Sequence, residues 1–90
     1  MYVIIDEKLD PIYGCVQGGH VVANFIKDFP GFWQNEYLIY LYADVEKWKN
    51  KLEKLNIPFS VFNEPDLNNK LTALAVLDHK NLFKNLSLLK

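Results

Sequence analysis

The chain has 90 residues, half of them hydrophobic, and a formal net charge of −1. This length suits one domain with its own core, so we expect a single domain over residues 1–90. The near-neutral charge is unlike that of strongly basic nucleic-acid-binding domains. All ten basic residues are Lys, so no guanidinium group is present to clamp a phosphate in two places, and any nucleic acid would be held by local Lys patches.

The single Cys15 cannot form an intramolecular disulfide, and no stretch approaches the length of a membrane span or the pattern of a secretory signal. We therefore expect a cytoplasmic protein with no membrane contact. Many Lys, Asn, Ile, Phe and Tyr residues with no Arg are what an AT-rich coding sequence gives, which favours a bacterial or viral source.

The first third of the chain predicts a strand followed by a helix. Tyr2–Asp6 is an apolar run with β-branched residues at its centre, typical of a buried strand. Residues 7–13 are expected to form a loop, in which Asp10-Pro11 is the turn signal. A helix is predicted over Gly14–Phe29, ended by Pro30-Gly31.

The remaining elements complete the order β-α-β-α-β-β-α, which predicts an α/β domain with parallel strand pairs and helices on the faces of its sheet. In such sheets ligands sit at the carboxyl ends of the strands. The expected elements are a strand over 36–42, a helix over 45–55 with Asp44 as N-cap and an apolar stripe ending at Leu55, a strand over 59–62, a polar loop over 63–70, a strand over 71–77, and a short helix after Asp78-His79-Lys80 that uses Leu82, Phe83 and Leu86.

The helix over 14–29 carries a polar stripe. Gln17, His20 and Asn24 follow helical spacing, and apolar residues cover most of the remainder, so we expect burial on more than one side. Gly18 and Gly19 each cost about 1 kcal/mol in a helix relative to Ala, which asks for a close approach to a strand or a ligand. The stripe has two interpretations, a polar pocket at the helix start or ordinary packing.

Single side chains in this helix are ambiguous. A lone His such as His20 is more often a packed core residue than a catalyst. Cys15 near a helix start can be a nucleophile, but a small core hydrophobe is the commoner role. Cys15, His20 and His79 have no known metal-ligand spacing, so we expect neither a metal nor a cofactor.

The loop before the last long strand is the second candidate region. It contains the acceptors and amides Glu64, Asp66, Asn68 and Asn69, and Thr72 follows at the start of the strand. These residues could present a site. They could equally be turn-forming residues followed by a β-former.

These features together resemble the peptidyl-tRNA hydrolase 2 family, in particular its reduced branch of small bacterial and phage proteins. Val16-Gln-Gly-Gly-His-Val-Val-Ala23 is similar to the Ala-Gln-x-x-His-Ala signature of the family, and Glu64 to Ala73 to its Glu-Pro-Asp-Leu-x-Asn-x-Leu-Thr-Ala segment. The resemblance implies a mixed four-stranded sheet with helices on both faces, often dimeric. It also implies cleavage, without metal, of the ester between a peptide and tRNA.

Carried over by position, the resemblance gives catalytic roles to Gln17, His20 and Thr72, with Glu64 or Asp66 in place of the family Asp. The family Lys four residues before the Gln is replaced here by Tyr13. We expect Tyr13, Asn24, Asn68 and Asn69 to contact the substrate.

Two other functions remain open. One is a non-catalytic binding module of the same fold, of the kind a phage could encode, for a small nucleotide, an RNA end or a host protein. The other is an interaction protein that uses Phe32 and Trp33 as a homodimer or partner surface.

Overall fold

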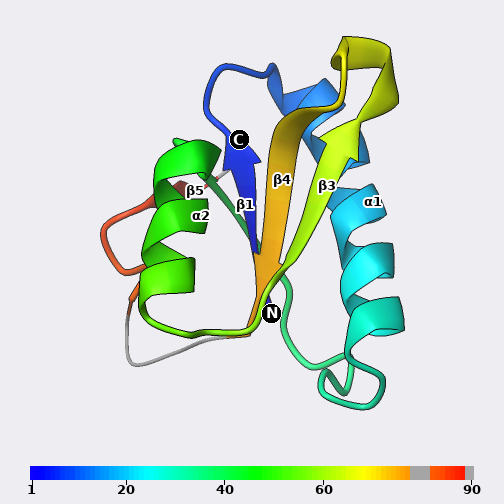
Figure 1. Cartoon of the computed structure of the whole chain (residues 1–90), viewed down its shortest axis with the longest axis vertical. Coiled ribbons are helices and arrows are strands. Elements are labelled where there is room, and N and C mark those ends of the chain that lie inside the picture. The colour runs from blue at the N-terminus through cyan, green and yellow to red at the C-terminus, as the bar shows by residue number, and fades with distance from the viewer. Residues whose placement is uncertain (78–81, 89–90) are drawn as a thin grey trace.

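The computed structural model describes residues 1–77 and 82–88 of the chain. Its mixed sheet has five strands, and one helix covers each face of the sheet (Figure 1). The α/β class and the helices on both faces are confirmed. The expected number of four strands is wrong, because a short fifth strand extends the sheet at one edge.

The elements lie close to the expected segments in the first 77 residues, with shifts of up to three residues at their ends. They are β1 (Tyr2–Asp6), α1 (Pro11–Asp28), β2 (Ile39–Ala43), α2 (Val45–Lys54), β3 (Ser60–Glu64), the 3₁₀ turn η1 (Pro65–Leu67) and β4 (Lys70–Val76). The short strand β5 (Ser87–Leu88) comes after them in the chain, and the strand order across the sheet is β3-β4-β1-β2-β5.

Helix α1 begins three residues earlier than predicted. Asp10 is its N-cap and accepts a hydrogen bond from the Tyr13 backbone N–H across 3.0 Å, and Pro11 occupies the first turn. Asp followed by Pro is therefore a helix start here and not a turn, because the fixed φ of Pro suits the first helical position. The predicted stop is confirmed, since Gly31 has a φ of 81° just after the helix.

Helix α1 buries one face only, which corrects the expectation of burial on several sides. Its buried residues are Gly14, Gln17, Gly18, Val21 and Phe25. Val16 and Ile26 are about half exposed, at 53% and 50%, because they lie on the side turned away from the sheet.

Helix α2 follows its prediction more closely. The Asp44 side chain accepts from the Lys47 backbone N–H, and Val45, Trp48 and Leu52 face the sheet. Leu55 does not join them, because it lies beyond the last helical residue as the C-cap and is half exposed.

The end of the chain departs most from expectation. Asp78, His79 and Lys80 fall outside the described residues, and residues 82–86 form turns followed by β5 where a helix was predicted. Phe83 is buried from this turn segment, with its ring 4.9 Å from that of Tyr2 and 5.1 Å from that of Trp48. The spacing of apolar residues that predicts a helix here instead accompanies the insertion of Phe83 into the core. Ser87 and Leu88 extend the sheet beside β2.

The directions of the strands bring the ends of several strands to one edge of the sheet. β1 and β2 are parallel, whereas β4 is antiparallel to both β1 and β3. The carboxyl ends of β1, β2 and β3 therefore lie at the same edge as the start of β4. Among the described residues, no helix is long and apolar enough to cross a membrane.

Candidate functional site

Gln17 lies at the centre of a buried chain of hydrogen bonds at this edge. Its Nε2 donates to Glu64 Oε1 across 2.9 Å, and its Oε1 accepts from Thr72 Oγ1 across 2.6 Å. Gln17 and Thr72 are fully buried and Glu64 is 9% exposed. The oxygen and the nitrogen of the Gln17 amide thus connect α1 to both β3 and β4. The series of hydrogen bonds ends at the Glu64 carboxylate.

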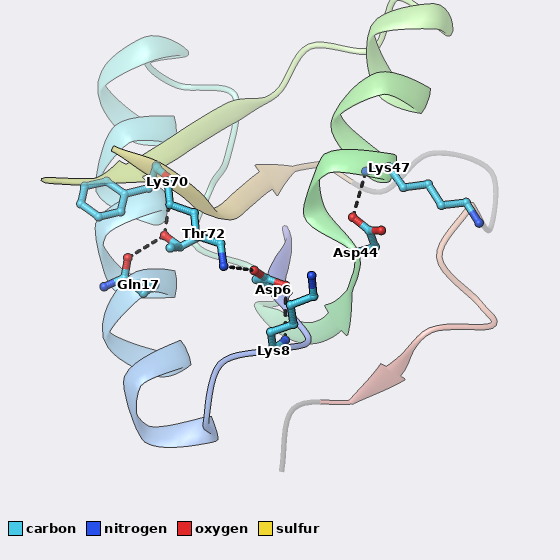
Figure 2. A network of polar contacts seen from close by, with 8 residues as sticks. Asp6, Lys8, Gln17, Asp44, Lys47, Lys70 and Thr72 are labelled. Atoms are coloured by element: carbon cyan, nitrogen blue, oxygen red, sulfur yellow. Dashed lines mark hydrogen bonds and ion pairs between the residues drawn. The ribbon is translucent and has the colours of Figure 1, made fainter. Parts of the chain in front are cut away.

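A β-bulge directs Thr72 into this network. Phe62 pairs with Ala73 and Asn63 with Leu71, so Thr72 is paired with no residue of β3 in the ladder, although its hydroxyl lies 3.3 Å from the Phe62 carbonyl oxygen. Its hydroxyl contacts Gln17 of α1 (Figure 2). Ala73 packs in the apolar cluster on the same side of the sheet. Two consecutive residues therefore face α1, which regular alternation along a strand would forbid.

Glu64 is held as a carboxylate by its donors. The hydrogen bond from Gln17 lowers the pKa of Glu64 below its usual 4.5, against the opposing effect of burial. The backbone N–H of Asp66, the hydroxyl of Tyr13 and the charge of His20 lower this pKa further. Glu64, and not Asp66, is thus the carboxylate that contacts Gln17.

Tyr13 supplies a second hydroxyl to Glu64, at 3.3 Å from Oε1. Burial raises the pKa of Tyr13 above 10, and the negative charge of Glu64 raises it further. The phenol therefore stays protonated and acts as a donor at neutral pH. Tyr13 is partly exposed, so it forms part of the rim of the site.

His20 lies one turn after Gln17, on the solvent side of the network. Its ring stacks on that of Phe62, with centroids 4.5 Å apart and planes 11° apart. His20 is exposed, and the described residues give its imidazole no hydrogen-bond partner. It is an imidazole fixed by stacking beside a carboxylate, with its nitrogens open to a ligand or water.

The structure does not bring the other expected site residues to this network as side chains. Asn24 donates to the Val61 carbonyl across 2.9 Å, which fastens α1 to the edge strand β3. Asn68 and Asn69 have φ values of 57° and 60°, and they form the left-handed turn that leads into β4. The exposed Asp66 contributes its backbone N–H to Glu64.

An ion pair at the same edge was not predicted. Lys70 Nζ lies 3.6 Å from Asp6 Oδ2, with the Asp6 side chain 7% exposed and that of Lys70 49% exposed (Figure 2). Lys70 also pairs directly with Glu64 across the β3–β4 ladder. Asp6 is the last residue of β1 and Lys70 the first residue of β4, so each places a charge next to a buried apolar run, and that pattern is the signal that could have identified them.

The two glycines of α1 have different surroundings. A Cβ on Gly18 would collide with the ring of Tyr40, so the predicted close approach to a strand is confirmed there. A Cβ on Gly19 would meet nothing within 4 Å, so the same expectation is wrong for Gly19.

Cys15 is exposed, which corrects its expected role as a core hydrophobe. It lines an open hollow of about 410 Å³ beside α1 together with Leu38, Ile39, Tyr40 and Leu88. None of the residues of the Gln17 network lines this hollow.

Trp33 donates from its ring nitrogen to the Tyr37 carbonyl and packs against the apolar cluster between α1 and the sheet. Phe32, in contrast, is 62% exposed. Only one residue of the expected aromatic surface therefore faces solvent.

Within residues 1–77 and 82–88, no group of three or more His, Cys, Asp or Glu side chains gathers to hold a metal ion. Comparison of the chain with protein-family models, with curated proteins and with solved structures finds no match in any of the three.

Proposed function

We propose that the protein hydrolyses the ester that joins a peptide or an N-blocked amino acid to the 3′ end of tRNA, with no metal in the reaction. The observation that carries this proposal is the ionised Glu64 carboxylate, fixed by Gln17 beside the exposed imidazole of His20. An imidazole with a carboxylate near it is suited to take a proton from water.

In the proposed reaction, His20 accepts a proton from the water whose oxygen attacks the ester carbonyl carbon. The carboxylate of Glu64 stabilises the imidazolium that forms. The ester bond then breaks, and His20 returns the proton to the departing ribose oxygen. The products are a free carboxylic acid and deacylated tRNA, so His20 ends the cycle neutral.

Tyr13 and Gln17 take different parts in this scheme. The Tyr13 hydroxyl is protonated, partly exposed and held by Glu64 only at 3.3 Å, so it can turn to donate to the substrate carbonyl oxygen. Gln17 and Thr72 are fully buried, so they act as positioning residues that hold Glu64. The Lys70 ammonium is a nearby cation in a chain that has Tyr13 at the position of the family Lys.

The test is hydrolysis of N-acetyl-aminoacyl-tRNA by the purified chain. His20→Ala should lose turnover, and Glu64→Gln should lose most of it, with melting temperature measured on the same samples. Glu53→Gln is the matched control, because it makes the same change at an exposed position of α2. Equal rates in the wild type and His20→Ala would overturn the proposal.

A second candidate, a non-catalytic binding module, is favoured by one observation. His20 stacked on Phe62 presents an exposed aromatic face of the kind on which a nucleobase stacks. This function predicts that a nucleotide or an RNA 3′ end raises the melting temperature with no product formed. The His20→Ala variant should abolish that rise.

A further inference from the structure

The side of α1 turned away from the sheet carries a regular apolar stripe. Its members repeat at alternating spacings of four and three residues, and they are Ile12, Val16, Gly19, Ala23 and Ile26. All five are exposed, and Ile12 reaches 80%. None of the described elements covers this side of α1 (Figure 1).

This spacing averages 3.5 residues, the repeat with which two helices pack along a shared seam. A solvated helix face needs no such repeat. The stripe is also graded in size, with bulky residues near both ends of the helix and the small Gly19 and Ala23 in the middle. Small residues allow two helix axes to approach closely.

We propose that α1 packs antiparallel against α1 of a second copy of this chain. A two-fold axis near the middle of the helix sets Gly19 against Ala23 of the second copy and Val16 against its Ile26. Small residues then meet small ones and bulky residues meet bulky ones. This is the self-complementarity that a two-fold symmetric interface requires.

Charge selects the antiparallel arrangement. Tyr13, His20 and Lys27 form the flank of the stripe, each following a stripe residue directly. At the Tyr13 end, the Asp10 carboxylate accepts from the Tyr13 backbone and the Glu64 carboxylate from its hydroxyl. At the other end, Lys27 is exposed and forms no ion pair within the described residues.

In an antiparallel pair, residues on this flank face the same flank of the partner helix. Lys27 of each copy then reaches the acidic Tyr13 end of the other copy. In a parallel pair, this flank would face the opposite flank of the partner helix, which carries the uncharged Cys15 and Val22, so Lys27 would meet no carboxylate. The second copy thus brings an ammonium group to the rim of the Gln17 site, which has Tyr13 where the resemblance would place a Lys.

The area buried between the two helices limits the affinity of this dimer. A helix of 18 residues is about 27 Å long and about 10 Å wide, so the pair covers roughly 500 Å² in total. Stable interfaces bury about 1,200 Å² or more. The dimer should therefore be weak, forming at concentrations of about 0.1–1 mM.

Sedimentation equilibrium across this range tests the proposal, with three variants. Gly19→Gln should weaken the dimer at least about tenfold by blocking close approach, while the melting temperature at low concentration stays the same or rises, because Gly19 has open space around it. Lys27→Glu should weaken the dimer about three- to tenfold. Lys54→Glu makes the same charge change on α2 and should leave the dimer unchanged.

A wild type that stays monomeric at about 1 mM, or a Gly19→Gln variant that dimerises as well as the wild type, would overturn the proposal. Loss of the dimer in Phe32→Asp but not in Gly19→Gln would likewise place the interface elsewhere. The readout is mass alone, so its outcome is independent of whether the protein hydrolyses an ester.

Discussion

Thr72 donates its hydroxyl proton to Gln17 across 2.6 Å from a strand position that is left out of the β3–β4 pairing. A single extra residue in β4 thus decides which way the hydroxyl points. The bond fixes the orientation of the Gln17 amide, because an oxygen must face Thr72 and the N–H groups must then face Glu64. The bulge in the sheet therefore determines which group Gln17 presents to the carboxylate.

A double-mutant cycle measures this link. Thr72→Val should lower the free energy of unfolding by about 1–3 kcal/mol, because Gln17 Oε1 is left buried without its donor. Gln17→Leu should cost a similar amount. The double variant should cost less than the sum of the two, by about 1 kcal/mol in urea unfolding. Strict additivity would mean that the two side chains stabilise the fold independently.

The pKa of Glu64 provides a direct probe of the same network. In the wild type, an NMR titration should place it below 4.5, and Gln17→Leu should raise it, because the hydrogen bond from Gln17 is the largest cause of the lowering. An unchanged pKa in Gln17→Leu would contradict the assignment of Gln17 as the principal donor.

The lowered pKa also sets how stability changes with pH. Folding is favoured by ionised Glu64 above 4.5, and this contribution is lost as the pH falls through the lower pKa of the folded state. Between about pH 7 and pH 3, the wild type should therefore lose more stability than Glu64→Gln, which does not titrate. Parallel losses in urea unfolding would refute the linkage.

The two neighbouring glycines of α1 should respond in opposite ways to the same substitution. Gly19→Ala should stabilise the monomer by about 0.5–1 kcal/mol, because Ala is the better helix former and the added methyl meets nothing. Gly18→Ala should destabilise it by about 1–2 kcal/mol, because the Tyr40 ring must move away. Thermal melts at low concentration make the comparison, and a stabilised Gly18→Ala would show that Tyr40 yields at little cost.

The ion pair between Lys70 and Asp6 should make a modest contribution. Lys70→Met should cost about 1 kcal/mol of stability, because it leaves the mostly buried Asp6 carboxylate without its cation while the Lys70 side chain is half exposed. Lys54→Met is the matched control at an exposed site of α2 and should have no effect. Equal melting temperatures for the two variants would assign no role to the pair.

Predictions of helix and strand positions were correct where residues within the segment itself determine its backbone conformation. Asp44 caps α2 as expected, Pro30-Gly31 ends α1, and the apolar run of β1 identifies a buried strand. These features depend on local backbone chemistry, which is visible at short range in a sequence. The Asp10-Pro11 start of α1 was also visible in principle, but the same pair occurs in turns.

Features that depend on contacts between residues far apart in the chain were harder to predict from the sequence. The choice between Glu64 and Asp66 is made by Gln17, which is 47 residues away from Glu64 in the chain. The orientation of Thr72 depends on the register of β3 against β4, and composition does not encode that register. Leu82, Phe83 and Leu86 fit a helical pattern, yet Phe83 is inserted between two aromatic rings from a turn.

The most direct test of the proposed activity is a single-turnover assay with enzyme in excess over N-acetyl-aminoacyl-tRNA, comparing the wild type with His20→Ala. We expect release of deacylated tRNA by the wild type and a rate at least about 100-fold lower in the variant, with equal melting temperatures. No release by the wild type, or the same rate in both proteins, would contradict ester hydrolysis with His20 as the base.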